Sequence, residues 1–251
     1  MRVLLLALPG LLVLLLLALF SVPARVLPAL IDGEQLRLSG LAGRAVDGSA
    51  ARALLQTPSG YFHLGELRWR LDPWSLLSLS PALDIESEWA TQRGSLRLRL
   101  AGSRLEALDL DAVIDASVVQ QALPVSVSGR LELLFSEVVI DAEQLLSAQG
   151  RLVWQNAAWQ SLAGPRPLGT YVADIETSAP AEIAARIATL SGDVEVAGDI
   201  TLTGKRFSTD LRVESARGAF DAELAQALSL IATPEENGYR LRLTGGLEPV
   251  Q

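Results

Sequence analysis

The stretch Ser95-Leu96-Arg97-Leu98-Arg99-Leu100 decides the fold class, because polar and apolar residues alternate through it without interruption. The stretch Glu66-Leu67-Arg68-Trp69-Arg70-Leu71 repeats this alternation. A period of two is typical of a β-strand that turns one face toward a core and the other toward water. Strands of this kind are found in antiparallel sheets, so the sequence predicts a mainly β protein built from antiparallel hairpins.

Similar patterns on both sides of these stretches extend the predicted sheet. Further strands are expected at 35–39, 104–114, 126–135, 150–154, 169–175, 193–203, 207–213 and 239–244. Glycine-centred turns separate alternating runs at 101–103, 191–193 and 203–205, as in β-hairpins. The alanine-rich segment 182–190 suits a helix by composition, but its apolar residues alternate and lead into a turn, so we interpret it as a strand.

Two segments carry helical spacing instead. In 219–231, apolar residues recur every three or four positions and form one stripe. They are Leu224, Ala227, Leu228 and Ile231. A shorter helix is expected at 115–123, with Val118, Val119 and Ala122 facing inward. The predicted architecture is therefore a curved antiparallel sheet of hairpins with one or two covering helices.

The amino-terminal segment has a different character. Residues 3–20 are apolar throughout except for Pro9 and Gly10, and they include eleven leucines. A helix of this length spans about 27–30 Å, which matches the hydrocarbon core of a bilayer. We expect a single transmembrane signal-anchor helix over 1–24 with a short cytoplasmic tail, followed by a β-rich domain over 25–251. A cleavable signal peptide is the alternative, since Val22-Pro23-Ala24 offers small residues for cleavage.

Composition excludes several classes of function. The formal net charge of -8 and the pI of about 4.8 disfavour binding to nucleic acid, because an acidic surface repels phosphate. The chain has no cysteine, which excludes disulfides, thiolate nucleophiles and cysteine metal sites. A single histidine, His63, leaves no imidazole cluster for zinc. We therefore expect no cofactor and no metal.

The residues that could carry chemistry have simpler interpretations. His63 lacks any accompanying nucleophile motif, and we expect no catalytic residue and no enzymatic activity. Two acidic sets have the residue types of calcium ligands or of glycosidase carboxylates, but their spacing fits the solvated face of a strand. These sets are Asp109/Asp111/Asp115 and Glu86/Glu88. Trp74 follows Pro73 in a predicted turn and is a candidate interface residue, although burial is the simpler expectation.

Two segments echo each other 107 positions apart. They are Gly43-Arg44-Ala45-Val46-Asp47-Gly48-Ser49-Ala50-Ala51 and Gly150-Arg151-Leu152-Val153-Trp154-Gln155-Asn156-Ala157-Ala158. Each is followed by a Leu-Gly pair, Leu64-Gly65 and Leu168-Gly169. Two similar halves, about 36–125 and 126–251, would explain the echo, while hairpins of similar construction would explain it equally well.

The order of three motifs resembles the protein N family of the type II secretion system. The first motif is an apolar amino-terminal segment that leads into Gly43 to Ala50, which is similar to a Gly-x-Val-Trp-x-Gly-x-Ala pattern. The second is a Leu-x-Trp-x-Leu-x-Pro strand end, here Leu67 to Pro73. The third is the closing Gly238-Tyr239 strand with Gly245-Gly246-Leu247. One departure is Val46, which stands where the pattern has tryptophan.

The resemblance implies an accessory inner-membrane component of type II protein secretion. It implies a single-pass protein of the bacterial inner membrane whose main domain lies in the periplasm and acts as a scaffold or assembly factor through protein–protein contacts. Its implied partners are other inner-membrane secretion subunits, with the outer-membrane secretin as a further candidate. A weaker likeness to AsmA-like proteins implies an alternative, a periplasmic lipid-binding or lipid-transfer module.

Overall fold

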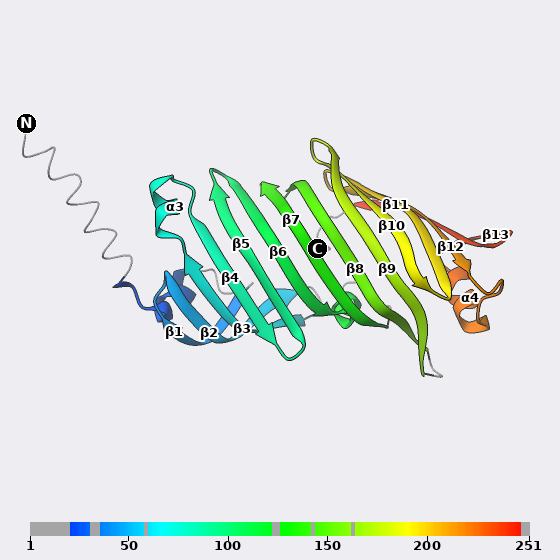
Figure 1. Ribbon diagram of the computed structural model, residues 1–251, viewed down its shortest axis with the longest axis horizontal. Helices are drawn as coiled ribbons and strands as arrows, with labels where there is room; N and C mark the ends of the chain where they lie inside the picture. The colour runs from blue at the N-terminus through cyan, green and yellow to red at the C-terminus, as the bar shows by residue number, and fades with distance from the viewer. Residues whose placement is uncertain are drawn as a thin grey trace, which may run out of the picture.

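The protein is described by a computed structural model over residues 21–30, 36–57, 60–121, 126–141, 144–161 and 164–246. Within these residues the chain forms one open sheet of 14 strands, nearly all in sequence order (Figure 1). Each strand pairs antiparallel with its neighbours, and only the last two strands exchange places, in the order β12-β14-β13. The predicted mainly β, antiparallel class is confirmed.

The strands follow one another through short connections. They are β1 (Leu36–Gly43), β2 (Asp47–Thr57), β3 (Gly60–Leu71), β4 (Ala82–Trp89), β5 (Gln92–Ala101), β6 (Arg104–Asp115), β7 (Val127–Asp141), β8 (Gln144–Ser161), β9 (Gly164–Ala179), β10 (Glu182–Gly192), β11 (Val194–Thr203), β12 (Arg206–Ser215), β13 (Thr233–Glu235) and β14 (Gly238–Gly246). The ambiguous segment 182–190 is a strand, as predicted. The three predicted glycine turns connect β5 to β6, β10 to β11, and β11 to β12.

Helices are few and short. They are η1 (Ala24–Val26), α2 (Leu27–Leu30), α3 (Pro73–Leu77), η2 (Ala116–Gln121) and α4 (Ala222–Ser229). The predicted helix at 219–231 is confirmed as α4, although it is shorter. The predicted helix at 115–123 is instead a 3₁₀ turn, η2, in agreement with the low helix propensity of its adjacent β-branched Val118 and Val119. The predicted turn after Pro73 is the helix α3.

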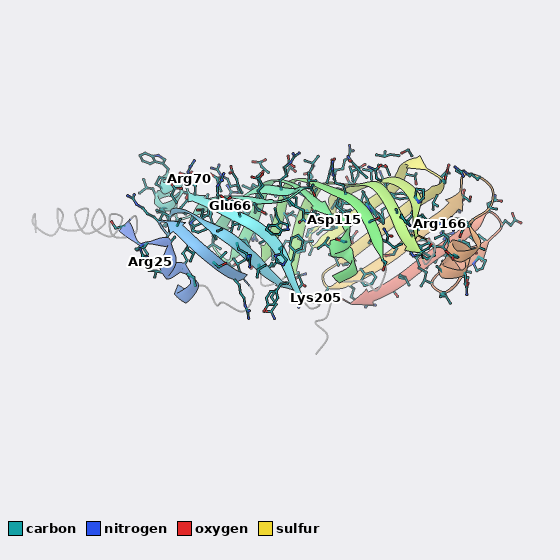
Figure 2. The ribbon with its side chains drawn as sticks, turned by 90° about the horizontal axis from the view of Figure 1, so that it is seen from below. Arg25, Glu66, Arg70, Asp115, Arg166 and Lys205 are labelled. Atoms are coloured by element: carbon teal, nitrogen blue, oxygen red, sulfur yellow. The ribbon has the colours of Figure 1, made fainter. Side chains whose placement is uncertain are left out.

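The sheet is curved, and Figure 2 shows it arching along its length with Glu66 and Arg70 on the upper side of the ribbon. A small core lies at the β1–β3 end. It contains Ala24, Ala50, Ala53, Leu67 and Trp69, so the segment that precedes the sheet packs against the first strands. At the opposite end of the long axis, α4 lies beside β12 (Figure 1). Short helices therefore flank both ends of the sheet.

Residues 1–20 of the predicted membrane anchor (1–24) lie outside the described residues. Among the residues that the structure does describe, no helix combines the length and hydrophobicity needed to cross a bilayer. The two predicted halves, about 36–125 and 126–251, are joined by continuous pairing of β6 with β7, from Arg104–Asp141 to Asp115–Arg130. The sheet is thus uninterrupted from β1 to the last strand.

Candidate functional site

One face of the sheet is apolar along its whole length. Cross-strand partners point to the same side of a sheet, so the pairing registers define rows of side chains. One such row runs through Leu71, Leu83, Leu98, Ala107, Val138 and Ala148. A second row runs through Ala112, Leu133, Leu152, Ala173 and Ile187. We call this surface the apolar face, and its larger side chains are mostly half-buried rather than covered.

The opposite side of the sheet is charged. Across β8 to β14, one row alternates in sign through Arg151, Asp174, Arg186, Asp199, Asp210 and Arg242, interrupted only where the two aspartates adjoin. Arg151 Nε lies 2.6 Å from Asp174 Oδ1, and this hydrogen bond raises the pKa of the arginine. Both side chains are more than half exposed, so each such pair contributes little to stability. The charged row makes this face suited to contact with water, in contrast to the apolar face.

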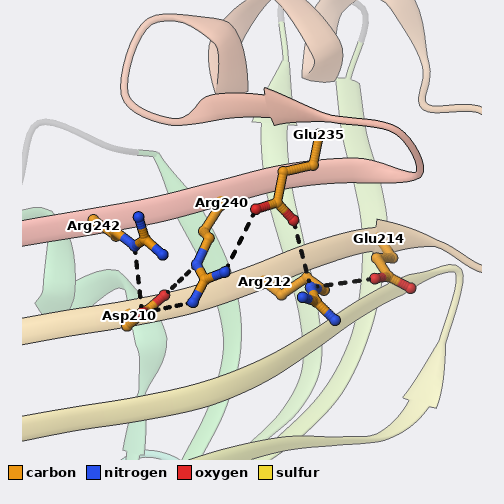
Figure 3. A network of polar contacts seen from close by, with 6 residues as sticks. All are labelled: Asp210, Arg212, Glu214, Glu235, Arg240 and Arg242. Atoms are coloured by element: carbon orange, nitrogen blue, oxygen red, sulfur yellow. Dashed lines mark hydrogen bonds and ion pairs between the residues drawn. The ribbon is translucent and has the colours of Figure 1, made fainter.

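Six charged residues of β12, β13 and β14 form a connected network at the carboxyl-terminal edge (Figure 3). Asp210 receives hydrogen bonds from Arg240 Nε at 2.7 Å and Arg240 Nη2 at 2.8 Å, and a longer one from Arg242. Hydrogen bonding by Arg240 lowers the pKa of Asp210 to about 2. Glu235 links Arg240 to Arg212, at 3.6 Å and 3.5 Å. The network ties the short edge strand β13 to the rest of the sheet.

An apolar cavity lies between the sheet and α4. Its volume is about 330 Å³, and side chains of β8 to β12 line it together with Leu224 and Leu228 of the helix. Asp221 caps the start of the helix, and its carboxylate accepts a hydrogen bond from the backbone amide of Glu223 at 3.1 Å. Asp221 also lies 3.8 Å from Arg166 at the start of β9. These two contacts help to set the position of α4 against the apolar face.

Two aromatic side chains form part of the cavity wall and contact each other. The ring centroids of Trp154 and Tyr171 are 5.9 Å apart. The Tyr171 hydroxyl donates to the Val194 carbonyl at 2.9 Å, and the Trp154 indole donates to the Ser128 carbonyl at 3.2 Å. Burial raises the pKa of Tyr171 to about 12, so its hydroxyl is neutral near pH 7. The polar atoms of both rings are satisfied, and the wall offers apolar surface to an occupant.

The residues considered for chemistry do not meet at one place. The His63 ring stacks on Trp89, with centroids 5.6 Å apart and planes 20° apart. Glu86 pairs with Arg68 across β3 and β4, and Glu88 pairs with Arg93 across β4 and β5. Within the described ranges, no three acidic or histidine side chains group as a metal site would require. Glu86 and Glu88 therefore lie on the charged face of the sheet.

A bulge changes the faces expected around Asp109. Strict alternation predicts that Asp109 and Asp111 share one side. Instead Asp109 has a φ of 50°, and the pairing register of β5 with β6 shifts between Ser95 and Arg97. The shift places Leu108 opposite Arg97 and Asp111 opposite Ser95, so Leu108 and Asp111 share the charged side. The alternation alone carried no signal for this bulge.

The amino-acid sequence from residue 34 to 242 matches the family model of the type II secretion system (T2SS), protein N. This chain belongs to the protein N family of the type II secretion system. No curated protein and no solved structure matches it. Membership in the protein N family implies that the chain works with other components of that secretion system, in a membrane-associated location. The matched region includes all strands from β1 to β13, so the apolar face is part of the family domain.

Proposed function

We propose that this member of the protein N family is a periplasmic scaffold or assembly factor of type II secretion, and that its apolar face binds apolar segments of other secretion subunits. One observation carries the proposal. The apolar rows continue from strand to strand, and among the described residues the longest helix, α4, has only eight residues. Extended apolar surface of this kind on a soluble domain marks an interaction site.

The dimensions suit a protein interface. Fourteen strands about 4.8 Å apart span roughly 60 Å, and ten residues of strand are about 33 Å long. The face therefore measures on the order of 2,000 Å², compared with about 800 Å² per partner in a stable interface of standard size. One partner segment, or two smaller ones, would fit along the rows without covering the charged side.

The proposal places the chain at the inner membrane, with the apolar run of residues 3–20 as its anchor and the sheet in the periplasm. Anchoring would hold the sheet near the secretion machine and raise its effective concentration there. We propose no catalytic role. In support, the ring of His63 stacks on Trp89, Glu86 faces Arg68 on β3, and Glu88 lies between Glu66 on β3 and Arg93 on β5.

A lipid-binding module is the second candidate, and the cavity beneath α4 favours it. The cavity is lined by leucine, valine, isoleucine, alanine and two aromatic residues, and its volume is about 330 Å³. Such a lining would accept part of an acyl chain that lies along the apolar face. The cavity continues into the rows of the face through Leu152, Ala173 and Ile187.

Site-specific photocrosslinking of the full chain in cells tests both candidates. A benzophenone amino acid is placed at Leu98 or Leu133 on the apolar face, and at Arg97 as the matched control, because Arg97 adjoins Leu98 and points to the other side. The scaffold role predicts adducts with another secretion subunit at Leu98 and Leu133, and none at Arg97. Adducts with lipid alone would favour the second candidate, and the absence of any adduct at both leucines would refute the two together.

A further inference from the structure

An exposed apolar group lies on the connection between β3 and β4. Trp74 and Leu77 of α3 are 77% and 59% exposed, and Leu79, directly after the helix, is 86% exposed. These three side chains, which we call the α3 patch, are among the most exposed large apolar residues of the described chain. None of them contributes to the small core at this end of the sheet.

The backbone holds the patch in a fixed shape. Asp72 caps α3 by accepting from the Trp74 amide at 3.0 Å, and Pro73 occupies the first turn, where its missing N–H costs nothing. Ser75 Oγ accepts from the Ala82 amide at 2.8 Å, which ties the helix to the start of β4. The amide of Leu79 donates to the Leu76 carbonyl at 3.2 Å. The exposed side chains are therefore presented by an ordered turn.

The α3 patch lies close to the place where the chain arrives from the apolar run 3–20. The Ala45 amide donates to the Val22 carbonyl at 2.8 Å, and the Leu71 amide donates to the Val46 carbonyl at 2.7 Å. Residues 44–46 therefore lie between Val22 and the end of β3, which places Val22 about 10 Å from Leu71, at about 5 Å for each pair of hydrogen-bonded chains. The helix α3 begins two residues after Leu71. Figure 1 shows α3 and the first described residues at the same end of the long axis.

The surroundings suit a lipid surface. Arg25, next to Ala24, and Arg44, which is bridged to Pro23, are both exposed at this end of the sheet. Cationic side chains close to a bilayer are attracted to anionic headgroups, and tryptophan and leucine favour the boundary between headgroups and acyl chains. The other end of the molecule provides a contrast, since α4 uses Leu224 and Leu228 to line the cavity.

We propose that Trp74, Leu77 and Leu79 insert into the periplasmic surface of the bilayer and form a second membrane contact beside the predicted anchor. This inference rests on the proposed inner-membrane location, but it does not depend on the partner of the apolar face. Two contacts would restrict rotation of the sheet about a single tether. The long axis would then have a preferred orientation, with the α3 end at the bilayer and the α4 end farther from it.

The absence of cysteine makes the test direct, since one introduced thiol can be labelled selectively. The full chain is prepared with Leu79→Cys or, as the matched control, Leu230→Cys, because Leu230 is 82% exposed at the α4 end. Each variant carries an environment-sensitive fluorophore and is reconstituted into vesicles of phosphatidylethanolamine and phosphatidylglycerol. A nitroxide lipid, labelled at the headgroup or high on the acyl chain, serves as the quencher.

The proposal predicts that the label at position 79 loses most of its emission to the nitroxide lipid, while the label at position 230 keeps most of its own. Equal quenching at the two positions would overturn the second contact. Flotation of the same vesicles separates this result from the location itself. A chain that floats but shows no quenching at position 79 refutes only the α3 contact, whereas a chain that does not float refutes the inner-membrane location and this contact with it.

Discussion

Replacing Trp69 with alanine should loosen one end of the sheet and leave the other end intact. Trp69 is 6% exposed and packs with Ala50, Ala53 and Leu67. Its indole donates to the Ala45 carbonyl at 3.0 Å. The same turn receives the first described residues, because the Ala45 amide donates to Val22. Trp69 therefore holds both the small core and the attachment of the preceding segment.

The expected loss follows from burial. Truncation of a buried tryptophan to alanine costs about 3–5 kcal/mol, and the indole hydrogen bond is part of that figure. A long open sheet resembles a repeat protein, since each strand contacts mainly its two neighbours. The loss should therefore fall on β1 to β3. Trp74→Ala is the matched control, because that side chain is 77% exposed and its truncation should change stability by less than about 0.5 kcal/mol.

Hydrogen exchange of the full chain, followed by mass spectrometry, measures the effect strand by strand. A local loss of 3–5 kcal/mol raises exchange from opened states by about 10²–10⁴-fold, at roughly tenfold per 1.4 kcal/mol. Peptides from β2 and β3 should show the rise in Trp69→Ala, while peptides from β11 and β12 should match the unaltered chain. A uniform rise over the whole sheet, or no rise at all, would refute the reasoning from local packing.

Three further predictions test other parts of the structure. Gly65→Ala should destabilise the chain by about 2 kcal/mol more than Gly102→Ala in urea denaturation. Both glycines have a left-handed φ, 76° and 66°, but only at Gly65 would an added Cβ strike the backbone of β4. Equal losses of stability would count against this clash. Asp210→Asn should lower the melting temperature at pH 6 but not near pH 2. Because Arg240 lowers the pKa of Asp210, the stability that this pair contributes is present above about pH 4 and is lost as the pH falls through about 2. A difference in melting temperature that persists near pH 2 would contradict this linkage. Leu133→Asp should weaken capture of the proposed secretion-subunit partner by about 100-fold in a pull-down from detergent extract, because burying an unpaired carboxylate costs about 3 kcal/mol. Unchanged capture would show that the row of side chains through Leu133 is not part of the interface.

Alternation of polar and apolar residues predicted most of the sheet but missed β2, β4 and the three-residue edge strand β13. β2 escaped because it is rich in alanine and because its pairing with β3 shifts register on both sides of Ala53. β4 does alternate, since Leu83 and Ile85 stand beside charged residues, but the run is short and carries the acidic residues Glu86 and Glu88. Of the two alternatives for Trp74, burial is wrong, because the side chain is 77% exposed. Exposure of a single side chain depends on the surrounding fold, which local periodicity does not contain.

Two hairpins of the sheet have the same pairing geometry, and they contain the two similar sequence segments. In each of two hairpins, a buried alanine at a register shift faces a glycine of positive φ. The corresponding pairs are Ala50–Leu67 with Ala53–Gly65 in β2–β3, and Trp154–Tyr171 with Ala157–Gly169 in β8–β9. Ala53 thus corresponds to Ala157 and Gly65 to Gly169, at a shift of 104 positions. The Leu-Gly pairs of the sequence echo share this spacing, whereas the segments that precede them are 107 positions apart. The two hairpins shift register at equivalent positions, so they correspond through the Leu-Gly pair and not through the segments that precede it.

Among the described residues, both ends of the apolar face are packed by other segments of the chain, and in the middle the 3₁₀ turn η2 contacts β7. At one end Ala24 and Leu27 pack on β2 and β3, and at the other α4 lies over the cavity. The row from Leu98 to Val138 crosses β7 at the end away from η2, because Val138 pairs with Ala107, whereas η2 follows Asp115, the partner of Arg130. Because strands in such a sheet are stabilised mainly by their neighbours, a bound partner should protect β5 to β7 from exchange before it affects either end. The location of that protection would identify the interface directly, whether the occupant is a protein segment or a lipid.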